Sequence, residues 1–125
     1  MTYSLLPHNS GFTTESVIRP AYELNCPMQA VPGTPPRSLP PLVAVDAPNV
    51  IVEAIKHAED EQAYVIRLYE PERSATKTTL SFGFLPKRVV NATMLEEPLN
   101  ELDLWDNRVQ VSMRAFEIKT ILAYY

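Results

Sequence analysis

The sequence predicts a mainly β protein: an antiparallel β-sandwich with a short N-terminal helical segment. From about residue 42 onward, runs rich in Val, Ile, Thr, Tyr and Phe recur at intervals of roughly 8–12 residues, the strand spacing of sandwiches. No helical pattern alternates with these runs, which argues against a parallel sheet. We therefore expect residues 1–41 to be a lead-in of strand, short helix and proline-rich segment, and residues 42–125 to form the sandwich domain.

The lead-in contains one expected strand and one expected helix. The strand is Tyr3–Leu6. The helix is Thr13–Leu24, because a threonine at its start can cap it and Glu15 lies in its first turn. Pro20 falls within that span and has no backbone N–H, so we expect the helix to be short or kinked there.

Prolines cluster between Pro32 and Pro41, which predicts an extended connection over the surface. Within it, Arg37–Leu42 has the form of a basic-flanked polyproline ligand for an SH3-type groove. A proline-stiffened linker is the simpler interpretation of the same residues.

At least six strands are expected after the linker. Two of the apolar segments, 49–57 and 63–70, are apolar on both faces, so we expect them to be central in their sheet. Turns are expected at Asp46–Pro48 and at Asp106-Asn107, a polar hairpin loop at 58–62, and prolines near strand ends at Pro71, Pro86 and Pro98. The expected strands are Leu42–Val45, Asn49–His57, Ala63–Glu70, Thr76–Phe84, Arg88–Leu95, Arg108–Arg114 and Phe116–Tyr124.

Alternation in the last two strands predicts which side chains face the core. In Arg108–Arg114 the alternation of Val109, Val111 and Met113 with polar residues predicts a half-buried strand. In the final segment we expect Glu117 and Lys119 to point outward. The side chains expected to point inward there are Phe116, Ile118, Leu122 and Tyr124.

The composition argues against several classes of protein. The net charge is −4 with both signs mixed, which lacks the basic face of a nucleic-acid binder. Only 3 glycines are present, and no phosphate-binding glycine motif occurs. No apolar run is long enough to span a bilayer, and the first residues lack the features of a secretory signal. Cys26 is the single cysteine, so no intrachain disulfide can form and we expect a cytoplasmic protein.

No catalytic or metal-binding set is expected within the chain. His8 and His57 are far apart in the sequence and lack zinc-ligand spacing; the alternative is that they converge in space with Asp46 or Glu53. Surface or half-buried imidazoles are the simpler interpretation, so we expect no cofactor in this chain. No nucleophile elbow of the G-x-S-x-G kind is present.

Carboxylates are the other candidates for chemistry, because glycosidases use two acids across a cleft. The acids at 59–61 and at 96–97 lie in expected loops, where side chains are ordinarily solvated. Glu53 and Glu70 lie within apolar strands. We expect Glu70 to form a strand-end salt bridge with Arg67 or Arg73 rather than to act in catalysis.

Two further features remain open. Asn91-Ala92-Thr93 matches a glycosylation sequon, which matters only in a secreted protein. Trp105, Tyr124 and Tyr125 are aromatic side chains that can stack on sugars, cap the core or fill an interface with a partner domain. Trp105 is our candidate for carbohydrate binding.

Several segments carry a resemblance to one family: Tyr3–His8, Ala21–Asn25, Val43–Lys56, Ala58–Asp60, Arg67–Glu70 and Arg114–Thr120. Together they resemble the C-terminal region of glycoside hydrolase family 38 α-mannosidases. The segment Val43–Lys56 resembles the family's V-D-A-P-N-V region, which runs through Ala58-Glu59-Asp60 into an R-L-Y-E strand. Here that strand ends Arg67-Leu68-Tyr69-Glu70. The ending Arg114–Thr120 resembles R-P-F-E-I-K-T, and Tyr3–His8 and Ala21–Asn25 resemble Y-x-L-x-P-H and A-Y-E-L-N. The sequence departs from the family at Ala115, which replaces a proline, and at Glu61-Gln62, which replace a glycine-rich hairpin.

The resemblance implies a part of a longer protein that hydrolyses α-mannosides with retention. In the family, the zinc site and the aspartate nucleophile belong to an N-terminal barrel, so this chain is expected to be inactive alone. We expect a structural domain that docks on the catalytic domain through Arg67, Tyr69, Glu70 and Phe116, with a homo-oligomer as a further option. The alternatives are a stand-alone carbohydrate-binding module that takes an α-mannoside near Trp105, and an enzyme in its own right.

Overall fold

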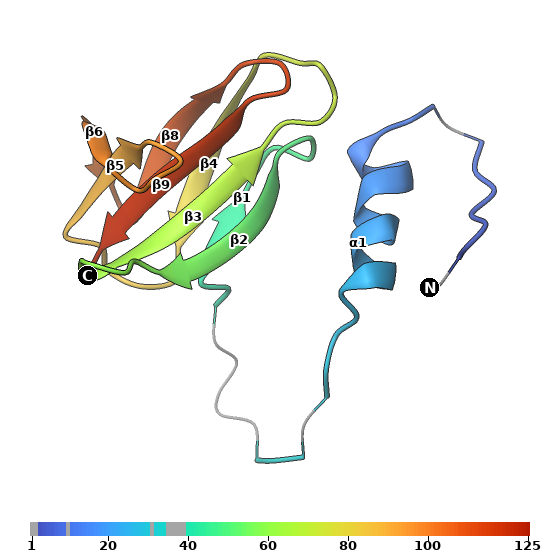
Figure 1. Ribbon diagram of the computed structural model, residues 1–125, viewed down its shortest axis with the longest axis horizontal. Coiled ribbons are helices and arrows are strands. Elements are labelled where there is room, and N and C mark those ends of the chain that lie inside the picture. The colour runs from blue at the N-terminus through green and yellow to red at the C-terminus, as the bar shows by residue number, and fades with distance from the viewer. Residues whose placement is uncertain (1–2, 10, 31, 35–39) are drawn as a thin grey trace.

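The computed structural model describes residues 3–9, 11–30, 32–34 and 40–125. It confirms the β-sandwich: two antiparallel sheets, with strand orders β1-β4-β8-β7 and β2-β3-β9-β5-β6, pack face to face (Figure 1). The strands are β1 (Val43–Val45), β2 (Ile51–His57), β3 (Ala63–Tyr69), β4 (Thr76–Phe82), β5 (Arg88–Ala92), β6 (Pro98–Leu102), β7 (Leu104–Trp105), β8 (Arg108–Met113) and β9 (Ile118–Tyr124).

The main core lies between the two sheets and follows the period-2 alternation of the strands. Val109, Val111 and Met113 of β8 face it, as the sequence predicts. From the five-stranded sheet, alternate residues of β3, β5 and β9 interdigitate with them. The buried core residues are Val50, Ile66, Leu68, Leu80, Phe82, Val89, Val109, Val111, Met113, Ile121 and Ala123.

A second apolar cluster lies on the outer face of the five-stranded sheet. It contains Ala63, Val65, Val90, Ala92 and Leu122, which alternate with main-core residues along β3, β5 and β9. These three strands are therefore buried on both faces. The cluster can stay out of water only because other segments cover this outer face in part.

The helical lead-in is confirmed. A π-helical turn (Thr14–Ile18) runs directly into α1 (Arg19–Asn25). Thr13 caps the turn: its hydroxyl accepts from Ser16 N at 3.1 Å, and the Ser16 hydroxyl accepts from Thr13 N at 3.1 Å. The winding tightens from π to α next to Pro20, the residue that has no N–H to donate.

The N-terminal helix lies beside β1 and β2, the edge strands on one side of the sandwich (Figure 1). Thr14 N donates to Glu72 Oε1 in the loop after β3, and the Tyr22 and Tyr69 rings lie 6.4 Å apart. A groove of 460 Å³ separates the helix from the edges of β1 and β2. The helix therefore lies along these two sheet edges on the far side of the groove.

The expected strand Tyr3–Leu6 is wrong, since the described residues 3–9 contain no strand. Tyr3, Leu5 and Leu6 are all exposed, so no packed face stabilises extended pairing there. Of the expected proline-rich connection, residues 35–39 lie outside the described part of the chain. The polyproline ligand at Arg37–Leu42 falls largely on those residues.

The expectation that the 49–57 strand is central in its sheet is wrong. β2 is an edge strand that pairs only with β3, and its register shifts between Val52 and Ala54. Its burial ends after its first two residues, and the side chains from Glu53 to His57 are exposed. An apolar run indicates burial only where both faces are covered, and here neither face of the second half of β2 is covered. β3, the other strand expected to be central, is central.

The prediction of which side chains in the last strand point toward the core is wrong. Ile121 and Ala123 of β9 face the main core, so Ile118, Leu122 and Tyr124 lie on the outer face. Lys119 points toward the other sheet, where its Nζ donates to the backbone oxygen of Ser112. Phe116 is exposed rather than inward, because its φ of 57° turns the chain before β9 begins.

Two short strands, β6 and β7, were not expected from the sequence. β6 is exposed along most of its length and β7 has only 2 residues, so neither shows an apolar alternation. The turn expected at Asp106-Asn107 is confirmed between β7 and β8. Both residues have positive φ, 44° and 59°, which matches the right-handed twist of a tight hairpin.

Substitution of Gly83 by alanine should destabilise the sandwich. A Cβ there would lie 2.4 Å from the backbone oxygen of Pro41, beside the bond from Gly83 N to Leu42 O that holds β1 against β4. We expect Gly83→Ala to lower the free energy of unfolding by about 1–3 kcal/mol in urea titration. Gly33→Ala is the matched control, because nothing lies within 4 Å of its added Cβ. Equal stability of the two variants would contradict this packing.

Candidate docking surface

The Glu70 carboxylate is buried at the end of β3 and holds three segments together. Its Oε1 accepts from Asn49 Nδ2 at 3.1 Å and from Glu72 N at 2.8 Å. Its Oε2 accepts from Ser74 N and Phe116 N, both at 3.1 Å. One side chain thus fixes the lead into β2, the β3–β4 loop and the β8–β9 turn.

The salt bridge expected between Glu70 and Arg67 or Arg73 is wrong. The donors to Glu70 are three backbone N–H groups and one amide, while Arg67 pairs with Glu96. Burial raises the pKa of Glu70, but the hydrogen bonds from Phe116, Glu72, Asn49 and Ser74 outweigh burial and hold the pKa below its ordinary value of 4.5. The carboxylate is therefore ionised near neutral pH, where it accepts hydrogen bonds from all three segments.

The β8–β9 turn that Glu70 holds carries exposed apolar side chains. Phe116, with its left-handed backbone, is 61% exposed, and Ile118 at the start of β9 is 53% exposed. Glu117 closes the turn by accepting from Arg114 N at 2.7 Å, and the Arg73 guanidinium lies 5.7 Å from the Phe116 ring centre. A fixed turn thus holds an aromatic ring in water.

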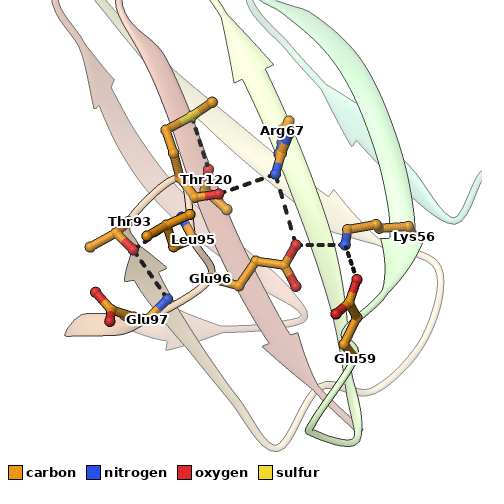
Figure 2. A network of polar contacts seen from close by, with 9 residues as sticks. Lys56, Glu59, Arg67, Thr93, Leu95, Glu96, Glu97 and Thr120 are labelled. Carbon is orange, nitrogen blue, oxygen red and sulfur yellow. Dashed lines mark hydrogen bonds and ion pairs between the residues drawn. The ribbon is translucent and has the colours of Figure 1, made fainter.

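An ion-pair bridge crosses the outer face of the five-stranded sheet (Figure 2). Glu96 Oε1 lies 2.6 Å from Lys56 Nζ and 3.8 Å from Arg67 Nη2, on neighbouring strands β2 and β3. Arg67 Nη2 also donates to Met94 O at 3.2 Å. Glu59 lies 4.0 Å from Lys56 at the outer end. The bridge ties the β5–β6 turn to strands that are distant from it in the sequence.

The β5–β6 turn itself is closed by Thr93. The Thr93 hydroxyl accepts from Leu95 N and Glu97 N, both at 3.2 Å, and Thr93 O accepts from Glu96 N at 3.0 Å. Glu96 has a φ of 69°, which turns its carboxylate back over the sheet. The same geometry leaves Leu95 83% exposed at the tip.

These elements form one surface, which we call the docking surface: Met94, Leu95, Phe116 and Ile118, bordered by the ion-pair bridge. Met94 joins its two halves, because the hydroxyl of Thr120 lies 3.8 Å from Met94 Sδ and Thr120 is two residues from Ile118 on the same face of β9. Beside it, a groove of 520 Å³ lies between the 58–61 loop and the β5–β6 turn, and both charge signs line it.

The structure separates the four residues that the sequence singles out for docking. Arg67 lies under Glu96, Tyr69 is partly covered by Tyr22, and Glu70 is buried, so Phe116 alone is freely exposed. Sequence reasoning missed Glu96 and its neighbours at 94 and 95. Acids before a proline resemble any solvated loop, and nothing in the sequence shows that Glu96 turns inward.

The remaining candidates lie elsewhere. Trp105 is on β7 in the opposite sheet, and Asn91 of the sequon is in β5, where its Nδ2 donates to Asn100. His57 lies beside Tyr125, with Nδ1 3.1 Å from the phenol oxygen. Among the described residues, no group of three or more His, Cys, Asp or Glu side chains is arranged to hold a metal ion. Nor does any helix in that part of the chain have the length and apolarity needed to cross a membrane.

Residues 49–121 match the glycosyl hydrolases family 38 C-terminal beta sandwich domain. The chain belongs to this family. The matched residues run from just before β2 into β9, so they include all of the docking surface. The family assignment confirms the resemblance seen in the sequence and agrees with the two-sheet fold.

The chain is also similar to three proteins that are named as α-mannosidases. The chain is 33% identical over 128 residues to Alpha-mannosidase 2C1 of Mus musculus and 32% identical to Alpha-mannosidase 2C1 of Homo sapiens. Each match covers 97% of the chain. Alpha-mannosidase G of Dictyostelium discoideum is 30% identical over 129 residues, which cover 95% of the chain. The chain spans 12% of the length of each relative.

Glu70→Gln should lower the free energy of unfolding and reduce its dependence on pH in the acid range. The substitution removes the charge that four donors share, so we expect a loss of about 3 kcal/mol at pH 7. Because the folded pKa lies below 4.5, the wild type has this stabilisation above pH 4.5 and loses it as pH falls through the folded pKa. Urea titrations from pH 7 to pH 3 measure both effects. The exposed Glu59→Gln is the control, and a wild-type pH slope in Glu70→Gln would refute the role of Glu70.

Proposed function

We propose that this chain is the C-terminal structural domain of an α-mannosidase and docks on the catalytic domain through the docking surface. The hydrolysis of α-mannosides would then belong to the whole protein and not to these residues. The names of the relatives support the activity, and the 12% coverage supports a part within a longer protein.

The docking surface is the observation that carries the proposal. Leu95, Phe116 and Ile118 are large apolar side chains held in water by two fixed turns, an arrangement that costs free energy unless a partner covers them. The ion-pair bridge beside them supplies polar groups of both signs, like the polar rim of an interface. A second copy of the chain is the other occupant that would suit such a surface, and it would give a homo-oligomer.

In this proposal, zinc binds to another part of the longer protein and not to this chain. A catalytic zinc needs three protein ligands around one point, and the described His, Cys, Asp and Glu side chains do not meet that need. We therefore place the metal and the nucleophile in the catalytic barrel. In this arrangement residues 1–41 form a lead-in, with the helix along the sandwich, and residues 42–125 form the docking domain. We propose the cytoplasm as its compartment, since a single exposed cysteine suits a reducing environment.

The proposal predicts that a charge on the docking surface disables the assembled enzyme while sparing the isolated domain. The test replaces the matching segment of mouse Alpha-mannosidase 2C1 with this chain. In that chimera, Ile118→Asp should lower aryl α-mannoside hydrolysis at least about tenfold, because an unpaired carboxylate would be buried at the interface. In the isolated chain Ile118 is exposed, so the melting temperature should stay within about 2 °C.

The matched control is Leu85→Asp. Leu85 is also a large exposed apolar side chain, but it lies in the β4–β5 connection, away from the docking surface. This variant should leave the chimera as active as the unsubstituted one. Equal activity of the Ile118 and Leu85 variants would argue against docking through this surface. Turnover of the aryl α-mannoside by the isolated chain, with zinc added, would overturn the assignment of catalysis to another domain.

A further inference from the structure

The outer face of the four-stranded sheet is polar and carries one exposed aromatic ring. Alternate residues of β4 and β8 that are not in the core point to this face. The core residues opposite them, such as Leu80 and Val111, are fully buried, which fixes the facing. The outward residues on these two strands are Lys77, Thr79, Ser81, Arg108, Gln110 and Ser112.

Trp105 lies at the edge of this polar face and is the chain's only tryptophan. Its backbone pairs with Arg108, so the two side chains share the outer face, and the indole is 43% exposed. The following turn, Asp106-Asn107, has two left-handed residues and is tied down by the bond from Phe82 N to Asn107 O at 2.9 Å. The ring is thus presented by a rigid hairpin rather than by a loose loop.

A groove of 290 Å³ lies beside the indole, lined by Glu101, Leu102, Asp103, Trp105 and Gln110. It forms where the chain crosses from β6 in one sheet to β7 in the other. Within the described part of the chain, the carboxylates of Glu101 and Asp103 and the Gln110 amide make no side-chain hydrogen bond or ion pair. Their hydrogen-bonding groups are therefore available at the groove.

We infer that this groove is a binding subsite for a single neutral hexopyranose ring. The apolar C–H face of a pyranose packs on an exposed indole. Its hydroxyls donate hydrogen bonds to carboxylates, and they can both donate to and accept from an amide. The two carboxylates disfavour an anionic sugar, because like charges would meet in the groove. The volume is at the small end of ligand sites, which suits one ring and not an oligosaccharide.

The subsite is independent of the docking surface. Trp105 belongs to the four-stranded sheet, whereas Ile118 and the ion-pair bridge lie on the outer face of the five-stranded sheet. The groove spans both sheets, because Glu101 and Leu102 lie on β6 of the five-stranded sheet, but it shares no lining residue with the docking surface or the ion-pair bridge. Sugar binding by the isolated chain and activity of the chimera are separate measurements, so either proposal can fail while the other stands.

Because Trp105 is the only tryptophan, its fluorescence reports on the groove directly. The 125-residue chain is titrated with methyl α-D-mannopyranoside, and with glycerol as a polyol lacking a ring face. We expect a saturable change in emission with the glycoside, with a Kd on the order of 1 mM, and only a linear drift with glycerol. A response that does not saturate, or one that glycerol reproduces, overturns the inference.

Substitutions of the groove residues test whether the sugar binds there. Gln110→Ala and Asp103→Asn should each raise the Kd at least about fivefold, since the first removes the amide and the second replaces a charged acceptor by a weaker neutral one, and both keep the fluorophore. Leu85→Ala, an exposed apolar truncation elsewhere, should leave the Kd unchanged. Calorimetry on Trp105→Phe and Trp105→Ala completes the series, with binding weakened in the first and lost in the second. Wild-type binding in Gln110→Ala and Asp103→Asn together would show that the sugar lies elsewhere.

Discussion

The arrangement of the sandwich depends on one buried carboxylate. Removing the charge of Glu70 from water is costly, and the cost is offset only when all four donors reach it together. Those donors come from segments that precede β2, follow β3 and precede β9. The loop that carries Glu72, the partner of the N-terminal helix, is shaped by the same carboxylate. The helix, the β3–β4 loop and the apolar β8–β9 turn are therefore not independent features.

The strands were predictable where side-chain alternation is governed by a single buried face. β8 shows that pattern, and its three inward residues follow from the sequence alone. β9 does not, because consecutive residues from Thr120 to Ala123 are buried on two faces, and alternation then has no unique phase. β2 misleads in the opposite way, since its apolar residues lie at an uncovered edge. The local pattern shows only which side chains are apolar. Whether they are buried depends on which other segments of the chain cover them.

The candidate site was predictable only in part, for a related reason. Phe116 and Arg67 could be chosen because they lie in segments that resemble the family, and both lie at or beside the docking surface. Glu96 could not be chosen, because its place depends on a left-handed backbone and on partners about 30 to 40 residues earlier in the chain. Trp105 was recognisable as a ring, but the groove beside it needs β6 and β7, two strands too short and too exposed to leave a pattern.

The position of β9 has a consequence for how the protein is made. The hairpins β2–β3 and β5–β6 form from neighbouring segments, but they join into one sheet only through β9, which lies between β3 and β5 and follows them both in the chain. During synthesis, the inner edges of β3 and β5 stay unpaired until the ribosome has released residues 118–124. Folding therefore closes late and through distant contacts, and in that interval the nascent chain is exposed to mispairing and suited to protection by chaperones.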